Sequence, residues 1–475
     1  MAAARRMVVV GGDAAGMTAA SQARRLQGPD ELEIVAFERG AFSSYSACGI
    51  PYWIGGDVDE RDDLIARTPE KHRERGIDLR MHTAVTALDL DGRRVRARGL
   101  PGSGAPDGEY WTDFDDLVLA TGARPMRPPL PGIDSEGVYG VQSLDDGQAL
   151  LDALHATEPE DGSGGRRRRA VVVGAGYIGV EMAEALVGRD YEVTVLDRAP
   201  QPMTTLDPDM GELVHDAMCG MGMEVVTGTT VTAIETGGAG EGEGGRARAV
   251  TTEETSYPAD VVVLGLGVVP ETSLAREAGL PLGESGGLLT DLAMRVRGHE
   301  NIWAGGDCVE VLDLVSGRTR HIALGTHANK HGQVIGAGIG GGYATFPGVV
   351  GTAVSKVCDL EIARTGLLEA QARAVGLQFV TVTAEATSRA GYFPGSRPMR
   401  VKMLAERGTG RLLGTQIVGR EGAGKRVDIA AVALTAGMTV EQMTYLDLGY
   451  APPFSPVWDP VLVAARKAAA VVRAG

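Results

Sequence analysis

One cysteine, Cys48, stands in a stretch of small residues whose pattern is typical of a reactive thiol. The stretch reads Ser-Tyr-Ser-Ala-Cys-Gly-Ile-Pro-Tyr over residues 44–52. Pro51 suits the first turn of a helix, where its missing N–H removes no hydrogen bond. A thiol at a helix N-terminus lies near unpaired N–H groups and the positive end of the helix dipole. We therefore expect a lowered pKa and a redox nucleophile at Cys48, with an inert buried cysteine as the alternative.

A dinucleotide-binding pattern precedes Cys48. An apolar strand at 7–10 leads to Gly-Gly-Asp-Ala-Ala-Gly at 11–16, a helix at 17–26 and a strand at 33–37 that ends at Glu38. Glycines let backbone N–H groups approach a pyrophosphate at the helix N-terminus, and the acid accepts hydrogen bonds from ribose hydroxyls. The pattern departs from G-x-G-x-x-G at Asp13, which replaces the middle glycine.

A second copy of the pattern follows Cys48 and is complete. A strand at 170–173 leads to Gly-Ala-Gly-Tyr-Ile-Gly at 174–179, a helix through 181–186 and a strand at 192–196 that ends at Asp197. Two such units predict two bound dinucleotides. Asp197 favours the free 2′-hydroxyl of NADH because a carboxylate repels a 2′-phosphate, whereas Arg198 beside it keeps NADPH open.

The other expected elements surround these two units. Apolar strands at 117–120 and 261–264 end in small-residue turns, and the strand after Asn301 leads to Asp307, an acid suited to a ribityl or phosphate contact. From about residue 343 the pattern predicts a third, α+β domain without a nucleotide motif. Its expected strands are 352–363, 376–384 and 411–419, and its expected helices are 425–436 and one that begins at 440–445. Prolines beside aromatics at 450–454 suit a docking surface.

The composition narrows the class of protein. The chain has 475 residues, enough for about three domains of ~150 residues, and a net charge of -16 argues against nucleic-acid or anionic-membrane partners. Its four cysteines form no CxxC pair, so neither a metal site nor a disulfide framework is predicted. No signal peptide and no apolar run of about 18 residues is visible, so we expect a cytoplasmic location. The segments 158–169 and 237–246 are expected to be solvated loops, with an anion site at the arginines of the first as the less favoured alternative.

Together these motifs resemble the FAD-dependent pyridine nucleotide-disulfide oxidoreductases over nearly the whole chain. The glutathione reductase type carries a second redox cysteine, but Ser43 and Trp53 hold the positions where it would stand. The lone Cys48 is similar to the branch with coenzyme A-disulfide reductase, NADH oxidase and NADH peroxidase. The stretches most similar to coenzyme A-disulfide reductases are 325–330, 351–357, 391–395 and 450–454.

Three positions depart from the patterns of this branch. The cysteine motif of the family has Phe and Asn where this chain has Tyr45 and Ala47, and the missing Asn leaves the substrate open. The oxidase and peroxidase relatives usually carry a histidine in the first glycine turn, where this chain has Ala14. Without that acid–base group, reduction of oxygen or peroxide is the less favoured activity.

The resemblance implies an α/β fold with two Rossmann-like dinucleotide-binding domains and a C-terminal α+β dimerisation domain. The FAD domain is expected at 1–145 and 285–342, the NAD(P)H domain at 146–284 and the dimerisation domain at 343–475. It also implies a homodimer in which the C-terminal domain of one subunit completes the active site of the other.

The same resemblance assigns the site residues. For FAD they are Gly11, Ala14, Ala15, Gly16, Glu38, Arg39, Val85, Thr121, Gly122, Asp307 and Ala328. For NADH or NADPH they are Gly174, Gly176, Tyr177, Ile178, Gly179, Asp197 and Gly267. For catalysis they are Cys48 and, as hydroxyl donors from the partner subunit, Tyr392 and Tyr450. The alternative for both tyrosines is an interface aromatic with a hydrogen-bonded hydroxyl.

The expected activity is the NAD(P)H-dependent reduction of coenzyme A disulfide or a similar small disulfide, with electrons passing through FAD to Cys48. One alternative is an NADH oxidase that uses a Cys48 sulfenate to reduce oxygen or peroxide, and another is a low-turnover flavoprotein redox sensor. Basic residues at 72–80 either bind substrate phosphates or form an exposed helix face; they are His72, Arg73, Arg75 and Arg80.

Overall fold

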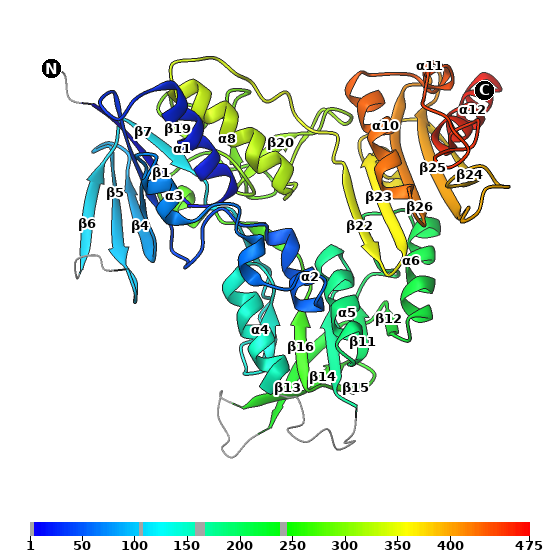
Figure 1. The fold of residues 1–475 in the computed structure, drawn as a ribbon, viewed down its shortest axis with the longest axis horizontal. Coiled ribbons are helices and arrows are strands. Elements are labelled where there is room, and N and C mark those ends of the chain that lie inside the picture. Colours follow the sequence, from blue (N-terminus) through cyan, green and yellow to red (C-terminus); the bar gives the residue numbers. More distant parts are fainter. Residues whose placement is uncertain (1–3, 104–107, 157–166, 238–244) are drawn as a thin grey trace.

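The chain forms three blocks of structure (Figure 1). The computed structural model describes residues 4–103, 108–156, 167–237 and 245–475. Most of the expected loops at 158–169 and 237–246 therefore lie outside the described residues. The first two blocks contain parallel sheets and the third an antiparallel one, which confirms the expected α/β fold with a C-terminal domain of different topology.

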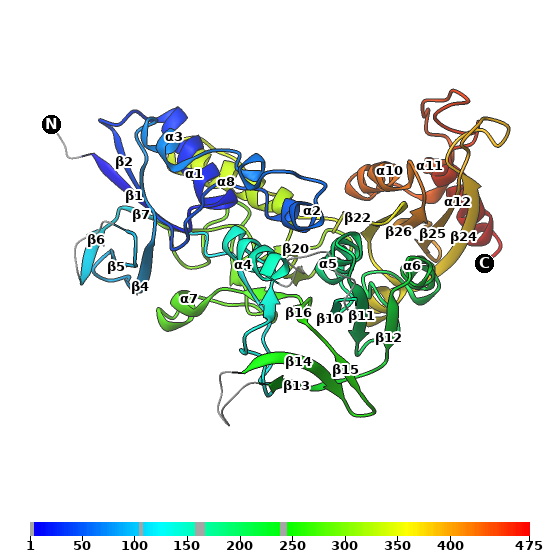
Figure 2. The same cartoon turned by 60° about the horizontal axis from the view of Figure 1, so that its bottom comes forward.

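The first block is built on a five-stranded parallel sheet in the order β19-β7-β1-β2-β3. Its strands are β1 (Arg5–Val10), β2 (Leu32–Phe37), β3 (Asp78–Arg80), β7 (Asp116–Leu119) and β19 (Ile302–Ala304). Long stretches of chain separate β19 from β7, so the block is discontinuous in sequence. A small antiparallel sheet lies beside the parallel sheet of this block in Figure 2. It consists of β4 (Thr83–Asp89), β5 (Arg94–Gly99) and β6 (Glu109–Asp113).

Two helices of the first block, α1 (Ala14–Leu26) and α8 (Gly325–Ile339), pack against each other at very short range. A Cβ atom on Gly332 would come within 2.5 Å of the Ala15 carbonyl oxygen, and one on Gly336 within 2.4 Å of the Ala19 oxygen. Only glycine permits this approach, which holds the N-terminus of α1 beside the turn after β19.

The second block repeats the arrangement with a parallel sheet in the order β12-β11-β10-β16-β9. Its strands are β9 (Val138–Gly140), β10 (Arg169–Val173), β11 (Glu192–Asp197), β12 (Glu224–Thr227) and β16 (Val261–Leu264). Helices α4 (Leu144–Ala156) and α5 (Tyr177–Gly188) belong to it, as does a small sheet of β13 (Val231–Gly237), β14 (Arg246–Thr252) and β15 (Ser256–Pro258). Because β9 pairs with β16, this sheet begins before the expected domain boundary at 145/146.

The third block is a five-stranded antiparallel sheet, β22-β23-β26-β25-β24, covered by helices. Its strands are β22 (Ala353–Val357), β23 (Leu360–Gly366), β24 (Phe379–Thr387), β25 (Pro398–Glu406) and β26 (Leu412–Gly419). Its helices are α9 (Glu369–Ala374), α10 (Ala423–Thr435), α11 (Val440–Thr444) and α12 (Pro460–Arg473). The single strand expected at 352–363 was wrong, because the chain reverses at Cys358, where φ is +45°, and forms the β22–β23 hairpin.

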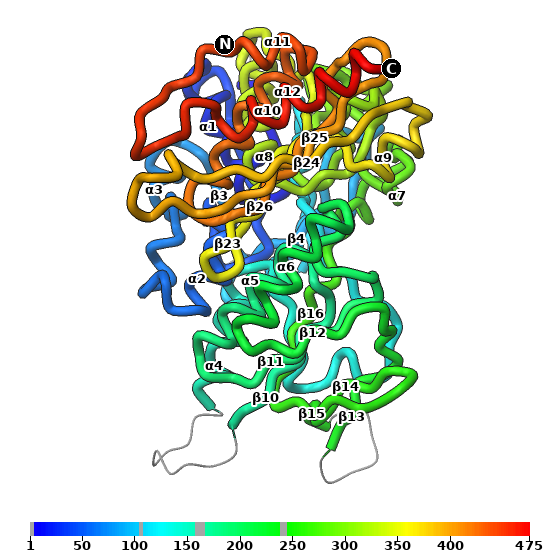
Figure 3. Tube along the Cα trace, turned by 90° about the vertical axis from the view of Figure 1, so that its right-hand side faces the viewer, coloured from blue at the N-terminus to red at the C-terminus, as the bar shows by residue number. Residues whose placement is uncertain are grey.

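Short elements complete the described chain. Those around Cys48 are the 3₁₀ turn Ala47–Gly49, α2 (Ile50–Gly55), a second 3₁₀ turn at Arg61–Leu64 and α3 (Pro69–Arg73). The remaining ones are β8 (Ala123–Pro125), α6 (Pro208–Gly220), β17 (Val268–Pro270), α7 (Ser273–Glu277), β18 (Leu288–Leu289), β20 (Val309–Leu312) and β21 (Thr319–Arg320). Helix α6 lies beside β23 and β26 in Figure 3, so the second block contacts the third.

A buried ion cluster joins these two blocks. Lys402 on β25 is 5% exposed, and its Nζ lies 3.1 Å from Asp207, 2.6 Å from Asp209 and 2.8 Å from Glu369. Asp207 is 3% exposed and also accepts a hydrogen bond of 2.7 Å from the Gln416 amide. Each buried charge therefore has a partner across the contact.

We predict that Lys402→Met will destabilise the protein by about 3–5 kcal/mol, because it leaves the Asp207 carboxylate buried without its cation. Urea unfolding followed by fluorescence measures the change. Lys425→Met is the control, since Lys425 is 86% exposed and pairs with Asp428 at the surface, where an ion pair contributes about 0–1 kcal/mol. Equal effects of the two substitutions would contradict the role of the cluster.

Candidate active site

The first glycine turn leaves no room for side chains at two positions. Gly11 has a φ of +110°, and a Cβ there would lie 2.1 Å from the Ala120 carbonyl oxygen. A Cβ on Gly16 would lie 2.0 Å from the Gly11 oxygen. The turn is thus closed against the end of β7 and leads directly into α1, as dinucleotide binding requires.

Glu38, at the end of β2, holds this turn with both carboxylate oxygens. Oε2 accepts from the Gly12 N–H and Oε1 from the Gly40 N–H, each at 2.7 Å. Arg39 next to it is exposed. Glu38 therefore faces the turn, at the position expected for the ribose-binding acid.

The other residues expected to hold FAD come from separate segments. Thr121 and Gly122 follow β7, and Asp307 follows β19, the neighbouring strand. A Cβ on Gly306 would lie 3.1 Å from the Ala15 Cβ and 3.8 Å from the Ala328 Cβ, so α1, α8 and the turn before Asp307 converge. The turn and the acids around it fit a dinucleotide. Val85 lies in β4, and no described contact joins it to this turn.

The second glycine turn has the same construction. Gly174 has a φ of +101°, and a Cβ on Gly179 would lie 1.9 Å from the Gly174 oxygen. Asp197 accepts from the Ala175 N–H at 2.5 Å and from the Ala199 N–H at 2.7 Å. The residues expected to bind NAD(P)H at this turn are therefore brought together, and Tyr177 and Ile178 open the helix α5 that follows it. Gly267, with φ +83°, lies between β16 and β17.

Cys48 lies in the 3₁₀ turn immediately before α2, and Pro51 lies in the first turn of that helix, as expected. Three hydrogen bonds fix the loop that precedes it. The Ser43 hydroxyl donates to the Gly12 oxygen at 2.7 Å, the Tyr45 N–H donates to Asp13 Oδ1 at 3.2 Å, and Ser44 Oγ lies 3.0 Å from His72 Nε2. The first glycine turn thus positions the cysteine loop directly.

The expected lowered pKa of Cys48 was wrong in direction. Although the residue is exposed at the surface, the pKa of its thiol is raised, first by burial against the protein and then by the carboxylates Glu181 and Asp307. The physical reason is that α2 has only six residues, and the dipole of so short a helix stabilises a thiolate at its N-terminus only weakly. Two acids oppose it.

The same charges locate Cys48 between the two glycine turns. Asp307 belongs to the first turn's surroundings, and Glu181 lies on α5, two residues after Gly179. The Ser355 hydroxyl on β22 donates to Glu181 at 2.8 Å, so the third block also reaches this region. Sequence reasoning missed Glu181 and Ser355; an acid on the first turns of the helix after a complete G-x-G-x-x-G was the available signal.

Tyr392 and Tyr450 lie in loops of the third block and are 78% and 48% exposed. They act on each other: burial first, and then the charge of Tyr392 and a hydrogen bond that Tyr450 donates to it, raise the pKa of Tyr450. Within the described chain no hydrogen bond or ring contact joins either tyrosine to the loop that carries Cys48. Phe454, Val457 and Trp458 are also exposed and add apolar surface to the same segment of chain.

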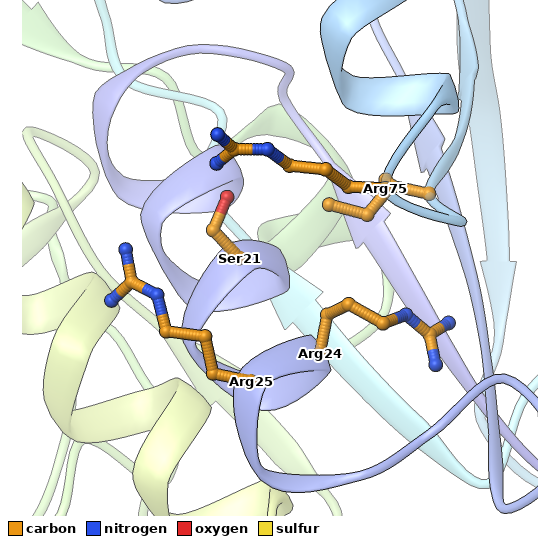
Figure 4. A pocket seen from close by; sticks show the side chains of 5 residues that line it. Ser21, Arg24, Arg25 and Arg75 are labelled. Atoms are coloured by element: carbon orange, nitrogen blue, oxygen red, sulfur yellow. The ribbon is translucent and has the colours of Figure 1, made fainter.

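A pocket of about 340 Å³ lies at the far end of α1 and is rich in arginine. Ser21, Arg24, Arg25, Arg75 and Ile77 line it. In Figure 4 the guanidinium groups of Arg25 and Arg75 flank Ser21 on one side, while Arg24 points away. Arg24 donates instead to the carbonyl oxygens of Gln27 and Gly76.

The charges around this pocket are not neutralised. The Arg67 guanidinium donates to the Ser21 hydroxyl at 3.3 Å, and burial followed by repulsion from Arg75 and Arg25 lowers its pKa. Among the residues that the structure describes, none of these three arginines forms an ion pair with a carboxylate. Of the four basic residues expected at 72–80, Arg75 alone lines this pocket. Arg73 pairs with Glu70, Arg80 pairs with Asp78, and His72 is buried. Sequence reasoning missed Arg25 and Arg67 because they lie on other segments.

Comparisons with known proteins identify the family whose sequence pattern this chain shares. The family model described as pyridine nucleotide-disulphide oxidoreductase matches residues 5–332, and the model for the dimerisation domain of that family matches residues 352–460. An NAD(P)H sulfur oxidoreductase (CoA-dependent) from Pyrococcus abyssi is 36% identical over 97% of this chain and 98% of its own. An NADH oxidase from Methanocaldococcus jannaschii is 35% identical over 98% of both chains.

A solved structure is similar over almost the whole chain. It is described as an NAD-dependent persulfide reductase from A. fulgidus, and it superposes with a TM-score of 0.91 at 38% identity, covering 99% of this chain and 84% of that one. The described residues contain no helix that is long and apolar enough to cross a membrane.

We predict that Glu181→Gln will lower the pKa of Cys48, because it removes a negative charge that disfavours the thiolate. Alkylation of Cys48 at pH 7.5, followed by peptide mass mapping, will therefore be faster than in the wild type. Glu184→Gln, one turn further along α5 and absent from the groups that act on Cys48, serves as the control. An unchanged alkylation rate in Glu181→Gln would refute the electrostatic account.

Proposed function

The chain belongs to the pyridine nucleotide-disulphide oxidoreductase family, and on that premise we propose that it is an NAD(P)H-dependent reductase of small sulfur substrates carried by coenzyme A, acting through Cys48. The substrate sulfur is a disulfide or a persulfide. The observation that carries the proposal is one cysteine between two dinucleotide turns, together with an arginine pocket that is linked to the cysteine loop through Ser44 and His72.

Two cofactors fit the two turns. FAD would be held at the first turn by Gly11, Gly16, Glu38 and Asp307, and it supplies two-electron transfer between nicotinamide and sulfur when bound. NAD(P)H would be held at the second turn by Gly174, Gly179 and Asp197. Both carboxylate oxygens of Asp197 accept hydrogen bonds from backbone N–H groups, and Arg198 beside it is exposed. The second turn therefore offers a cation for a 2′-phosphate as well as an acid for a ribose hydroxyl.

Cys48 acts as the nucleophile in thiol–disulfide exchange. Its thiolate attacks one sulfur of the substrate, a bond forms between that sulfur and Sγ, and the other substrate sulfur leaves as a thiolate and takes up a proton. Cys219, Cys308 and Cys358 lie in α6, after β19 and in the β22–β23 hairpin, and no described contact joins them to Cys48. Reduction of the mixed disulfide therefore requires electrons from NAD(P)H.

The arginine pocket supplies recognition of the substrate's anionic part. Coenzyme A carries its phosphates at the end opposite its thiol, and arginines without carboxylate partners are suited to phosphate oxygens. The link between pocket and thiol is short in the fold: Ser44 of the cysteine loop bonds to His72 of α3, and Arg75 follows α3. A nucleotide-bearing thiol is thus favoured over a small neutral one.

A homodimer is part of the proposal. The matched dimerisation domain supports it, and so do the exposed aromatics Tyr392, Tyr450, Phe454 and Trp458, because an apolar surface of this kind is typical of an interface. In the dimer, Tyr392 and Tyr450 of the partner would donate hydroxyl hydrogen bonds to sulfur at Cys48.

An oxidase is the second candidate, favoured by the Methanocaldococcus jannaschii relative named NADH oxidase. Ala14 argues against it, because the first glycine turn then lacks an acid–base side chain at that position. The two activities separate when NADH consumption is followed under air and under nitrogen, with and without coenzyme A disulfide.

We predict that Cys48→Ser will abolish disulfide and persulfide reduction while dye reduction by NAD(P)H continues at the wild-type rate, because the exchange step alone needs the sulfur. Steady-state assays with coenzyme A disulfide, coenzyme A persulfide and a ferricyanide-type dye measure both. Full turnover of the sulfur substrates by Cys48→Ser, or a full wild-type rate with oxygen alone, would overturn the proposed function.

We predict that Arg25→Ala and Arg75→Ala will each raise KM for coenzyme A disulfide by about tenfold or more, since a charge-assisted hydrogen bond contributes about 1.5–3 kcal/mol. KM for a disulfide without phosphates will not change. Arg94→Ala is the control, because Arg94 pairs with Asp89 on the small sheet β4–β6, outside the pocket. An equal rise in KM for the disulfides with and without phosphates would show that the pocket does not recognise phosphate.

A further inference from the structure

Asp13 occupies the position of the middle glycine in the first glycine turn. Its counterpart in the second turn is Gly176, and both residues form the N-cap of the helix that follows. A Cβ on Gly176 would meet nothing within 4 Å, so the second turn is open there, where dinucleotide turns let the backbone approach the pyrophosphate. In the first turn a carboxyl group stands at this position.

The charged groups that act on the Asp13 carboxyl are themselves acids. Oδ1 accepts from the Tyr45 N–H of the cysteine loop at 3.2 Å. The carboxylates that act on it are Glu38, at the end of β2, and Asp307, after β19. Burial first, and then the carboxylates Asp13, Glu38, Asp145 and Asp146, raise the pKa of the Tyr45 hydroxyl on the cysteine loop. No ion pair with Lys, Arg or His is formed by Asp13 in the described residues.

These neighbours favour the neutral form of the carboxyl. Burial first, and then Glu38 and Asp307, raise the pKa of Asp13 to about 6, against the backbone N–H groups of Tyr45 and Ala14, which lower it. A bound pyrophosphate would add two more negative charges at the same helix N-terminus. A neutral carboxyl removes one repulsion and offers an O–H donor while its other oxygen still accepts from Tyr45.

We propose that Asp13 takes up a proton when FAD binds at the first glycine turn, so that this residue makes flavin affinity depend on pH. The inference rests on the proposed function for its flavin. Because the same carboxyl holds the Tyr45 N–H, its protonation state also acts on the loop that carries Cys48.

Titration of the apoprotein with FAD between pH 6 and 8.5, followed by flavin fluorescence, tests the proposal. For the wild type, Kd rises about tenfold for each pH unit above the pKa near 6, as proton uptake by one group requires. For Asp13→Asn and Asp13→Gly, Kd is independent of pH over this range and, at pH 8, lower than for the wild type. Asp145→Asn is the control, since Asp145 lies on α4, acts on Tyr45 and is absent from the groups that act on Asp13; it keeps the wild-type slope.

Calorimetry in two buffers of different ionisation enthalpy gives the second readout. Close to one proton is taken up per FAD by the wild type at pH 7.5, and none by Asp13→Asn. A pH-independent Kd in the wild type, or an unchanged slope in both Asp13 variants, overturns the inference. Failure of every variant and of the wild type to bind FAD at any pH would instead overturn the proposed function.

Discussion

The structure depends on one repeated interaction: a carboxylate at the end of a parallel strand holds the backbone N–H of a glycine turn and the N–H two residues beyond itself. Glu38 does this in the first block and Asp197 in the second, with each hydrogen bond between 2.5 and 2.7 Å. Each bond is charge-assisted and therefore stronger than one between neutral groups. The turns keep this shape because a side chain at Gly16 or Gly179 would collide with a carbonyl oxygen.

The first of these turns fixes the loop that carries Cys48. The turn provides the Gly12 oxygen and the Asp13 carboxyl that fix the cysteine loop, and Asp307 beside it adds negative charge to the thiol. The arginines lie elsewhere, at the far end of α1 and after α3. Negative charge thus surrounds the sulfur and positive charge surrounds the pocket, which suits a substrate with a neutral reacting sulfur and an anionic distal part.

The sequence predicts the two parallel units well because each glycine and acid has a local steric reason. Strands β1, β2, β10 and β11 and helices α1 and α5 lie within a few residues of their expected bounds. The third block was predicted less well, since β25 was missed and the β22–β23 hairpin was taken for one strand. The hairpin turns at Cys358 and Asp359, and this pair is a weaker turn signal than a pair with Gly or Pro. For α12 the signal existed, because Asp459 caps it and Pro460 opens it. The arginine pocket and the raised pKa of Cys48 depend on residues brought together only by the fold.

The raised pKa of Cys48 bears on the direction of exchange rather than on reactivity alone. In a mixed disulfide, the thiol of lower pKa is the better leaving group. Burial, Glu181 and Asp307 disfavour a thiolate at Cys48, whereas a small substrate thiol released to solvent has no such neighbours. A thiolate that attacks the Cys48 sulfur of the mixed disulfide would form a bond to Sγ and expel the small thiol as its thiolate, which then takes up a proton. No second cysteine is described near Cys48, so this asymmetry sets which sulfur of the mixed disulfide departs, while the two electrons that reduce it have to come from NAD(P)H.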